Sequence, residues 1–195
     1  MLELLTKRRT QYALGRNLNL TEDAIDQLIR DGIRNSPSPF NSQSSRAIIL
    51  FGDESQKFWN IVKDEVRPLV APDMLEGSMT KISSFAAGVG TILFFEDQQT
   101  VQDLQKEWPI FAEHFPDWSE QSGGMAQYVV WTMLANKNIG ASLQHYNPIV
   151  DAKVAATWDV PSSWRLRAQM PFGSNEAPFP DKEFMPDAMR FRTHR

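Results

Sequence analysis

Apolar residues recur every three or four positions in the segment 21–33, and this spacing predicts a helix with one side in the core. Thr21 lies just before the pattern, and threonine often accepts a hydrogen bond from the free backbone N–H groups at a helix start. The same spacing predicts a second helix from Asp53 to about Val66, with Asp53 as its cap. No helix is predicted in the segment between these two helices.

Four short segments have patterns that favour strands. The runs 47–51 and 91–95 are continuously apolar, which is typical of strands buried on both faces. The segment 164–170 alternates apolar and polar residues, which is typical of a half-buried strand. A short strand and turn are expected at 141–148, after Gly140. Strands and helices interleave along the chain, but periodicity alone predicts no order for the strands.

Two helices are predicted between the strands at 91–95 and 141–148, one ending near Pro116 and one beginning at Ser119. The loop between them contains Phe115 and Trp118. These two aromatic residues either fill a gap between the helices or form a mobile lid that contacts a planar substrate, and the sequence favours neither interpretation.

The helix from Ser119 has an apolar stripe, which we interpret as core, within one chain or shared with a second subunit. Two glycines inside this helix, Gly123 and Gly124, each cost about 1 kcal/mol relative to alanine. They indicate that another group approaches the helix backbone closely. The stripe consists of Met125, Tyr128, Val129, Thr132 and Met133.

A chain of 195 residues is long enough for one domain with a substantial core, and we expect a single domain over 1–195. Its 42% hydrophobic and 23% charged residues are typical of globular proteins rather than disordered or membrane proteins, and no apolar run is long enough to span a bilayer. Without cysteine, disulfides and thiol nucleophiles are excluded, and with only three histidines no metal site is expected. The net charge of −4 argues against nucleic-acid binding, and no secretory signal is recognised, so a cytoplasmic location is expected.

The segment 36–46, between the first helix and the first strand, is rich in short polar side chains and contains two prolines. Proline fixes the backbone and removes a hydrogen-bond donor, so neither helix nor sheet continues through this segment. The composition suits a ligand with a polar rim and a flat apolar body. It is also the composition of an ordinary turn, which the segment alone would favour.

The run Ser36-Pro37-Ser38-Pro39-Phe40-Asn41-Ser42-Gln43 resembles the flavin-binding loop of the nitroreductase family, which are FMN-dependent NAD(P)H oxidoreductases. Further motifs resemble the family in the same order and cover nearly the whole chain. They are most similar to its short, stress-linked and fatty-acid-responsive members. These motifs are Arg8-Arg9-Thr10, GTILFFED at 90–97, WSEQS at 118–122 and GASLQHYNP at 140–148.

The resemblance implies an α+β, three-layer fold with a mixed, mainly antiparallel sheet flanked by helices. It also implies a domain-swapped homodimer with two FMN sites at the interface. The implied activity is hydride transfer from NAD(P)H to nitroaromatic, quinone or similar planar acceptors by a ping-pong mechanism, with the chemistry on FMN and no catalytic side chain. The alternative is a flavin-binding stress-response or regulatory protein whose nitroreductase activity is incidental.

The resemblance also assigns cofactor-binding residues. It places Arg8, Arg9 and Thr10 at the FMN phosphate, where the alternative is a solvated basic turn at a helix end. Lys81 is assigned to the pyrimidine edge of the flavin, where the alternative is a solvated charge. The flavin neighbours implied in the two loops are Ser36, Pro37, Ser38, Asn41, Gln43, Leu143, Gln144 and His145.

The stretch 171–195 has four prolines and no periodic pattern, yet it carries several large apolar residues. A disordered tail would not normally do so, and we expect an extended arm that is buried against a partner subunit. Near its end, Arg190 and Arg192 resemble the basic pair that reaches the FMN phosphate in the family, and the alternative is a basic tail in solvent. The apolar residues are Phe172, Phe179, Phe184, Met185, Met189 and Phe191.

Overall fold

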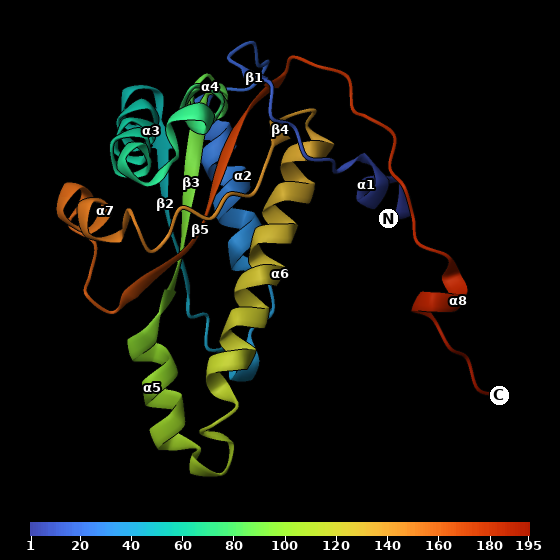
Figure 1. Cartoon of the computed structure of the whole chain (residues 1–195). Helices are drawn as coiled ribbons and strands as arrows, with labels where there is room; N and C mark the ends of the chain where they lie inside the picture. The colour runs from blue at the N-terminus through green and yellow to red at the C-terminus, as the bar shows by residue number, and fades with distance from the viewer.

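The centre of the molecule is the buried strand β3 (Gly90–Asp97), which has a strand paired on each side. β2 (Ser45–Phe51) lies on one side and β5 (Trp164–Asn175) on the other, and both ladders are antiparallel. The short strands β1 (Leu14–Gly15) and β4 (Gly140–Ala141) pair antiparallel with the end of β5. Figure 1 shows this five-stranded sheet in the computed structural model, which describes residues 1–195.

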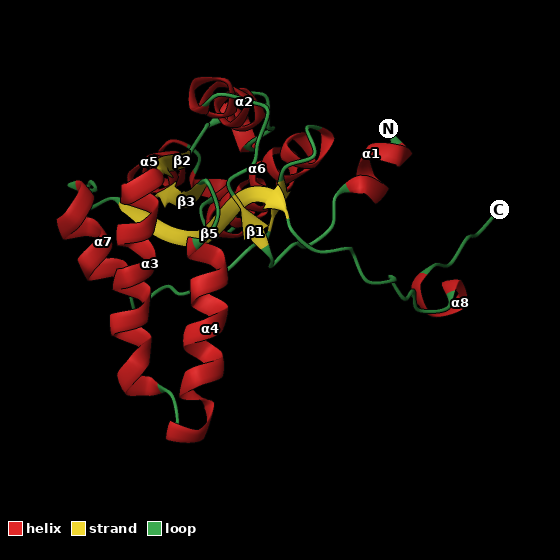
Figure 2. Ribbon diagram, turned by 90° about the horizontal axis from the view of Figure 1, so that it is seen from above, coloured by secondary structure: helices red, strands yellow, loops and turns green.

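Helices cover both faces of the sheet and give the molecule three layers (Figure 2). α2 (Glu22–Arg34) and α6 (Phe115–Asn136) pack on one face. α3 (Gly52–Val66), α4 (Leu75–Ala86) and α7 (Asp151–Trp158) pack on the other. The expected α+β fold with a mainly antiparallel sheet between helices is therefore confirmed.

The remaining helical elements are short and lie at the ends of the molecule or between the larger elements. No helix has both the length and the apolar character needed to cross a membrane. The helices are α1 (Leu2–Lys7), α5 (Gln98–Glu107) and α8 (Asp187–Arg190), and the 3-10 turns are Pro39–Asn41, Arg67–Leu69, Pro72–Met74 and Pro109–Phe111.

Two hydrophobic clusters fill the space between the sheet and the helices, one on each face of the sheet. The central strand β3 contributes to both clusters, because its successive side chains point to opposite faces. Leu93 and Phe95 of β3 point toward α3 and α4, whereas Ile92 and Phe94 point toward α2 and α6. The fully buried Thr91 accepts a hydrogen bond from the Trp59 indole at 2.8 Å. Pairing of such buried polar groups avoids the cost of desolvating them alone.

The first helices and strands mostly follow the predictions. Thr21 caps α2, because its hydroxyl accepts a hydrogen bond from the Ala24 amide at 3.2 Å. The cap predicted at Asp53 is wrong, because α3 begins one residue earlier, at Gly52, and Asp53 lies in its first turn. The strand predicted at 47–51 is present, but it lies at the edge of the sheet, and Leu50 is its one buried residue.

The last strand is longer than predicted, and the arm is correspondingly shorter. β5 continues through Pro171 to Asn175, and Phe172 is a fully buried core residue rather than an anchor of the arm. The carbonyl of Pro171 accepts from the Ser142 amide, so the missing N–H of the proline faces this short segment and not the long β3 ladder. The arm therefore comprises residues 176–195, which extend away from the sheet in Figures 1 and 2.

The long helix α6 also differs from the prediction, because it begins at Phe115 and includes the segment expected to be a loop. The predicted stripe is not the core of this chain, since Met125 is 42% and Tyr128 is 43% exposed. A different face is buried, and its serines can be buried because Ser119 and Ser122 donate to carbonyls of their own helix at 2.8 and 2.9 Å. The buried residues are Phe115, Ser119, Ser122, Ala126, Val130, Leu134 and Ala135.

The close approach predicted at the two glycines of α6 is not found within this chain. A Cβ at Gly123 would lie 3.5 Å from a carboxylate oxygen of Glu96, whereas a Cβ at Gly124 would meet nothing within 4 Å. The distance at Gly123 is an ordinary van der Waals contact, so within one chain the prediction is wrong for both glycines.

Candidate functional site

A cavity of about 510 Å³ lies between the N-terminal segment 8–13 and the first residues of the arm. Thr10 forms a parallel bridge with Ala141 of β4, and the Glu176 amide donates to the Ala13 carbonyl at 3.0 Å. These contacts fix the cavity at the end of the sheet where β4 and β5 meet. Its lining includes Arg8, Arg9, Thr10, Tyr12, Pro180 and Lys182.

The two adjacent arginines of this cavity have different surroundings. The guanidinium carbon of Arg8 lies 4.5 Å from the ring centre of Trp131 on α6, and its buried Nε has no hydrogen-bond partner. The guanidinium of Arg9 donates to the carbonyl of Pro180 and lies 5.9 Å from the ring centre of Phe179. Arg8 is therefore packed on the body of the protein, whereas Arg9 contacts the arm.

Two further cations lie at or beside this cavity. Lys81 of α4 lies beside it, with its ammonium nitrogen 5.6 Å from the ring centre of Tyr12, and Tyr12 lines the cavity. Lys182 lines the cavity from the arm and was not predicted from the sequence. The sequence indicates only that a basic residue follows shortly after Pro180. Lys182 reaches the cavity because the arm contacts the N-terminal segment, which is far away in the sequence.

The segment after β4 pairs with the middle of β5. The Gln144 amide donates to the Gln169 carbonyl at 2.7 Å, and the Gln169 amide donates back at 2.9 Å. The Gln144 amide therefore has an acceptor within the chain. Leu143 is half-buried and His145 is exposed beside it.

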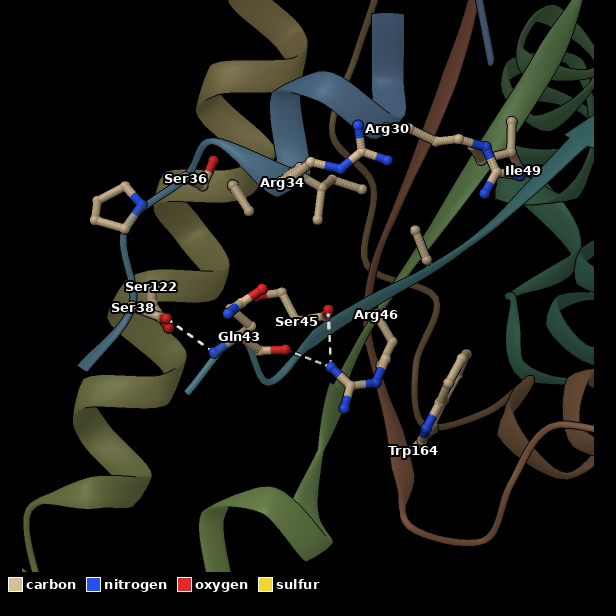
Figure 3. A pocket seen from close by; sticks show the side chains of 14 residues that line it. Arg30, Arg34, Ser36, Ser38, Gln43, Ser45, Arg46, Ile49, Ser122 and Trp164 are labelled. Atoms are coloured by element: carbon tan, nitrogen blue, oxygen red, sulfur yellow. Dashed lines mark hydrogen bonds between the residues drawn. The ribbon is translucent and has the colours of Figure 1, made fainter. Parts of the chain in front are cut away.

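The loop 36–46 lies at the opposite end of the sheet and has an unusual backbone. Three of its residues have positive φ angles, namely Phe40 at 54°, Asn41 at 52° and Gln43 at 50°. The Ser38 hydroxyl accepts a hydrogen bond from the Gln43 amide at 2.9 Å, and Arg46 donates to the Gln43 carbonyl (Figure 3). The loop is thus folded on itself rather than extended.

A second cavity, of about 390 Å³, lies between this loop, α2, the edge strand β2 and α6 (Figure 3). Its three arginines each pair with a carboxylate, and the distance is 2.9 Å from Arg46 to Asp97. The lining combines Arg30, Arg34 and Arg46 with Ser36, Pro37, Ser38, Gln43 and Ser45, and with apolar residues that include Ile49 and Trp164.

The predicted cofactor residues of the N-terminal segment and those of the loop 36–46 therefore lie at opposite ends of the sheet, and the segment 143–145 lies between them, beside the middle of β5. The ladder of β2 runs from Ser45, next to the loop, to Phe51, which lies at the same end of the sheet as the first cavity. At about 3.4 Å per residue, the two groups are about 20 Å apart along the strand. Arg190 and Arg192 are exposed and line neither cavity. α8, which ends at Arg190, lies away from the sheet in Figures 1 and 2.

The two aromatic residues with a predicted substrate role lie in an aromatic cluster near the loop. Phe115 is only 1% exposed, and its ring centre lies 5.4 Å from those of Phe40 and Trp118. Phe115 therefore fills a gap between elements, as one of the two interpretations predicted. Trp118 is half-buried and also stacks on His114, with ring centres 5.4 Å apart.

Glu96, near the end of β3, is a buried acid that was not predicted as a site residue from the sequence. The side chain is 1% exposed, and its Oε1 atom has no hydrogen-bond partner. Burial raises the pKa of Glu96 to about 7, and the nearby Ser44 and Arg46 oppose this only in part. A substantial fraction of the molecules therefore holds a proton on this side chain at neutral pH.

A model of the nitroreductase family matches residues 5–174. The chain belongs to the nitroreductase family. The family and the fold that the sequence motifs predicted are thereby confirmed, and the chain is an oxidoreductase of the nitroreductase type. The individual cofactor-binding residues stay predictions.

Several solved structures and a curated relative are similar to this chain, and three of the structures contain a bound small molecule. Nitroreductase CinD from Lactococcus lactis, solved with chloramphenicol, is 45% identical, has a TM-score of 0.91 and matches 100% of this chain and 99% of its own. CinD with 4-nitrophenol has a TM-score of 0.88, at 45% identity and with the same shares of each chain covered. The nitroreductase FRM2 of Saccharomyces cerevisiae is 32% identical over 186 residues, which are 94% of this chain and 92% of FRM2. A Desulfovibrio desulfuricans protein solved with FMN shares the fold, with a TM-score of 0.72 at 14% identity over 100% of this chain and 96% of its own.

Proposed function

We propose that the protein uses FMN to transfer hydride from NAD(P)H to nitroaromatics, quinones or similar electron-poor planar acceptors. The observation that carries this proposal is the cavity where Arg9, Thr10 and Lys182 gather at the end of the sheet. The complexes of CinD with chloramphenicol and 4-nitrophenol support the class of acceptor. The FMN complex of the Desulfovibrio desulfuricans protein supports the cofactor.

The residues of this cavity fit an FMN phosphate. A guanidinium, an ammonium and a hydroxyl group are matched donors for a phosphate dianion. Lys81 is placed beside Tyr12, where it would hold the pyrimidine edge of the flavin.

The separation of the two groups of cofactor residues supports a homodimer. Along the strand direction alone, one chain places the loop 36–46 about 20 Å from the phosphate cavity, so in this proposal the loop of a second copy covers the flavin. Apolar surface is open for such an interface, since Tyr128 is 43% exposed on α6 and Phe184 is 73% exposed on the arm. Two equivalent flavin sites would then form between two copies.

When bound, FMN supplies the hydride chemistry. The chain itself binds the phosphate through Arg9 and Lys182, orients the ring through the loop, and excludes water by closing the interface. No side chain at either cavity is needed as a nucleophile. Because the electron donor and the acceptor need the same position over the ring, they bind in turn, and ping-pong kinetics are expected.

The proposal is tested by the visible absorption spectrum and by titration of flavin-free protein with FMN. A flavin spectrum and saturable FMN binding are expected, together with parallel double-reciprocal plots for NAD(P)H and 4-nitrophenol. A colourless protein that takes up no FMN would overturn the assignment of the cofactor. Intersecting plots would overturn the ping-pong mechanism alone.

A further inference from the structure

The loop 36–46 contains a turn with a strained backbone, and residues outside the loop hold this turn in place. Phe40, Asn41 and Gln43 all have φ angles near +50°, and such angles are unfavourable for residues with a side chain. Asparagine tolerates this conformation better than most residues, but phenylalanine does not. A strained backbone persists only where the surrounding structure holds it, so Phe40 must gain compensating contacts.

Hydrogen bonds within the loop define its shape but do not attach its tip to the rest of the protein. The Asn41 amide donates to the Ser38 carbonyl at 3.1 Å, and the Ser42 amide donates to the Pro39 carbonyl at 3.0 Å. The Ser38 hydroxyl accepts from the Gln43 amide at 2.9 Å. Donor and acceptor of all three bonds belong to the segment 38–43.

The ring of Phe40 makes the contacts that do attach the tip. Its centre lies 5.3 Å from the ring centre of Trp108, 6.0 Å from that of Phe111 and 5.4 Å from that of Phe115. These three residues belong to the connection between α5 and α6 and to the start of α6. Phe115 is buried and Phe40 is 50% exposed, so the ring of Phe40 packs into the cluster from the surface.

We infer that Phe40 is a positioning residue for the cofactor: its ring, packed among Trp108, Phe111 and Phe115, holds the loop in the strained shape that presents Ser38 and Asn41 to FMN. This inference rests on the proposed function of the loop. The positive φ of Phe40 directs its ring into the aromatic cluster, and the aromatic contacts offset the strain. The adjacent polar residues are thereby fixed before any ligand arrives, which lowers the entropy lost on binding.

In this arrangement Phe115 and Trp118 support Phe40 and do not act as a lid over the substrate. Phe115 contacts Phe40 directly, and Trp118 packs against Phe115 at 5.4 Å. Substitutions at either residue therefore act on FMN binding through the loop, even if neither residue touches the substrate.

The test uses Phe40→Gly, which removes the ring and also relieves the backbone strain, because glycine adopts positive φ angles freely. The expected result is FMN affinity at least about tenfold weaker than wild type, with a small change in the melting temperature because the two effects oppose each other. In flavin-free protein, hydrogen exchange at the amides of Asn41, Ser42 and Gln43 should become faster. Phe40→Tyr keeps the ring and should restore wild-type affinity and exchange.

Leu69→Ala serves as the matched control, because Leu69 is 66% exposed at the turn between α3 and α4. This control should change neither FMN affinity nor exchange in the loop. Wild-type affinity and wild-type exchange in Phe40→Gly would overturn the inference. If Phe40→Gly does not fold, Trp108→Ala removes one side of the cluster without altering the loop, and the same two outcomes apply.

The two readouts separate this inference from the proposed function. If wild-type protein binds no FMN, the proposed function fails and the loop has no FMN to position, so the inference fails with it. If wild-type protein binds FMN and Phe40→Gly binds it equally well, the inference fails and the proposed function stands.

Discussion

The guanidinium of Arg8 lies over the ring of Trp131, with 4.5 Å between the guanidinium carbon and the ring centre, whereas the next residue, Arg9, donates to the carbonyl of Pro180. The two arginines share a motif but contact different parts of the structure. Arg8 connects the N-terminal segment to α6, and Arg9 faces the cavity next to the arm. Their substitutions should therefore have different effects.

Arg9→Ala should weaken FMN binding by roughly 10- to 150-fold, because a charge-assisted hydrogen bond contributes about 1.5–3 kcal/mol. Arg8→Ala should instead lower the melting temperature, since a cation–π contact contributes about 0.5–2 kcal/mol to stability. Flavin titration and thermal unfolding of both variants measure the two effects, with Arg9→Lys as the charge-conserving control. A larger loss of FMN affinity in Arg8→Ala than in Arg9→Ala would contradict this division of roles.

A chain that ends after Pro178 should lose both dimerisation and FMN. This truncation keeps the contacts of Glu176 and Ala177 with the N-terminal segment. It removes Lys182 and the exposed apolar residues of the arm, which we expect to be buried against a partner subunit. Size-exclusion chromatography and absorption spectroscopy test the two losses separately, and a truncated protein that remains a yellow dimer would refute the role of the arm.

The double variant Arg190→Ala/Arg192→Ala should remain a dimer, because it removes no apolar side chain. If both arginines reach the phosphate in the dimer, its FMN affinity should fall by about two to four orders of magnitude, at about 1.5–3 kcal/mol for each lost bond. Added salt should weaken FMN binding by the wild type more than by the double variant, because exposed ion pairs are screened. Unchanged affinity would indicate that this end of the arm is a solvated basic tail.

Glu96 should make the stability of the protein depend on pH. Burial raises the pKa of Glu96 to about 7 from 4.5, so the folded protein keeps this proton to a higher pH than the unfolded chain does. Stability should therefore fall as the pH rises from about 4.5 to about 7, and this contribution should level off above that. Between pH values of about 5.5 and 8.5 the loss attributable to Glu96 is about 2 kcal/mol, at about 1.4 kcal/mol per pH unit below 7.

Glu96→Gln keeps a neutral side chain of similar size and should abolish this contribution. Urea unfolding of both proteins at the two pH values measures it, and titrations common to both proteins cancel in the comparison. A wild type and a Glu96→Gln variant with the same pH dependence of stability would show that Glu96 titrates normally.

The sequence predicted the elements whose pattern is strong and local. The helix starting after Thr21 and the apolar strand at 91–95 are found because their periodicity agrees with their burial. The start of α6 was missed because Pro116 suggested a break, although proline is tolerated in the first turn of a helix. The buried face of α6 was missed because two serines lie on it, each bonded to its own helix.

The sequence motifs predicted which segments line the cavities, but they did not predict the contacts between those segments and the rest of the chain. The motifs identified Arg9, Thr10 and the loop 36–46, which line the two cavities. They did not indicate that Arg8 packs on Trp131 or that Lys182 joins the cavity. Nor did they indicate that Phe40 packs against Trp108. Each of these contacts joins residues far apart in the sequence, and no local pattern encodes them.

The central claim is that the protein turns over as an FMN oxidoreductase rather than binding flavin for regulation alone. The most direct test is anaerobic stopped-flow spectroscopy of the FMN-loaded protein, first with NADH or NADPH and then with 4-nitrophenol. We expect rapid loss of the flavin absorbance with one of the two donors, and rapid recovery on addition of the acceptor, with neither step slower than steady-state turnover. Flavin absorbance that is not lost with either donor, or that does not recover when the acceptor is added, would contradict a function as an FMN oxidoreductase. Either step being much slower than steady-state turnover would contradict it as well.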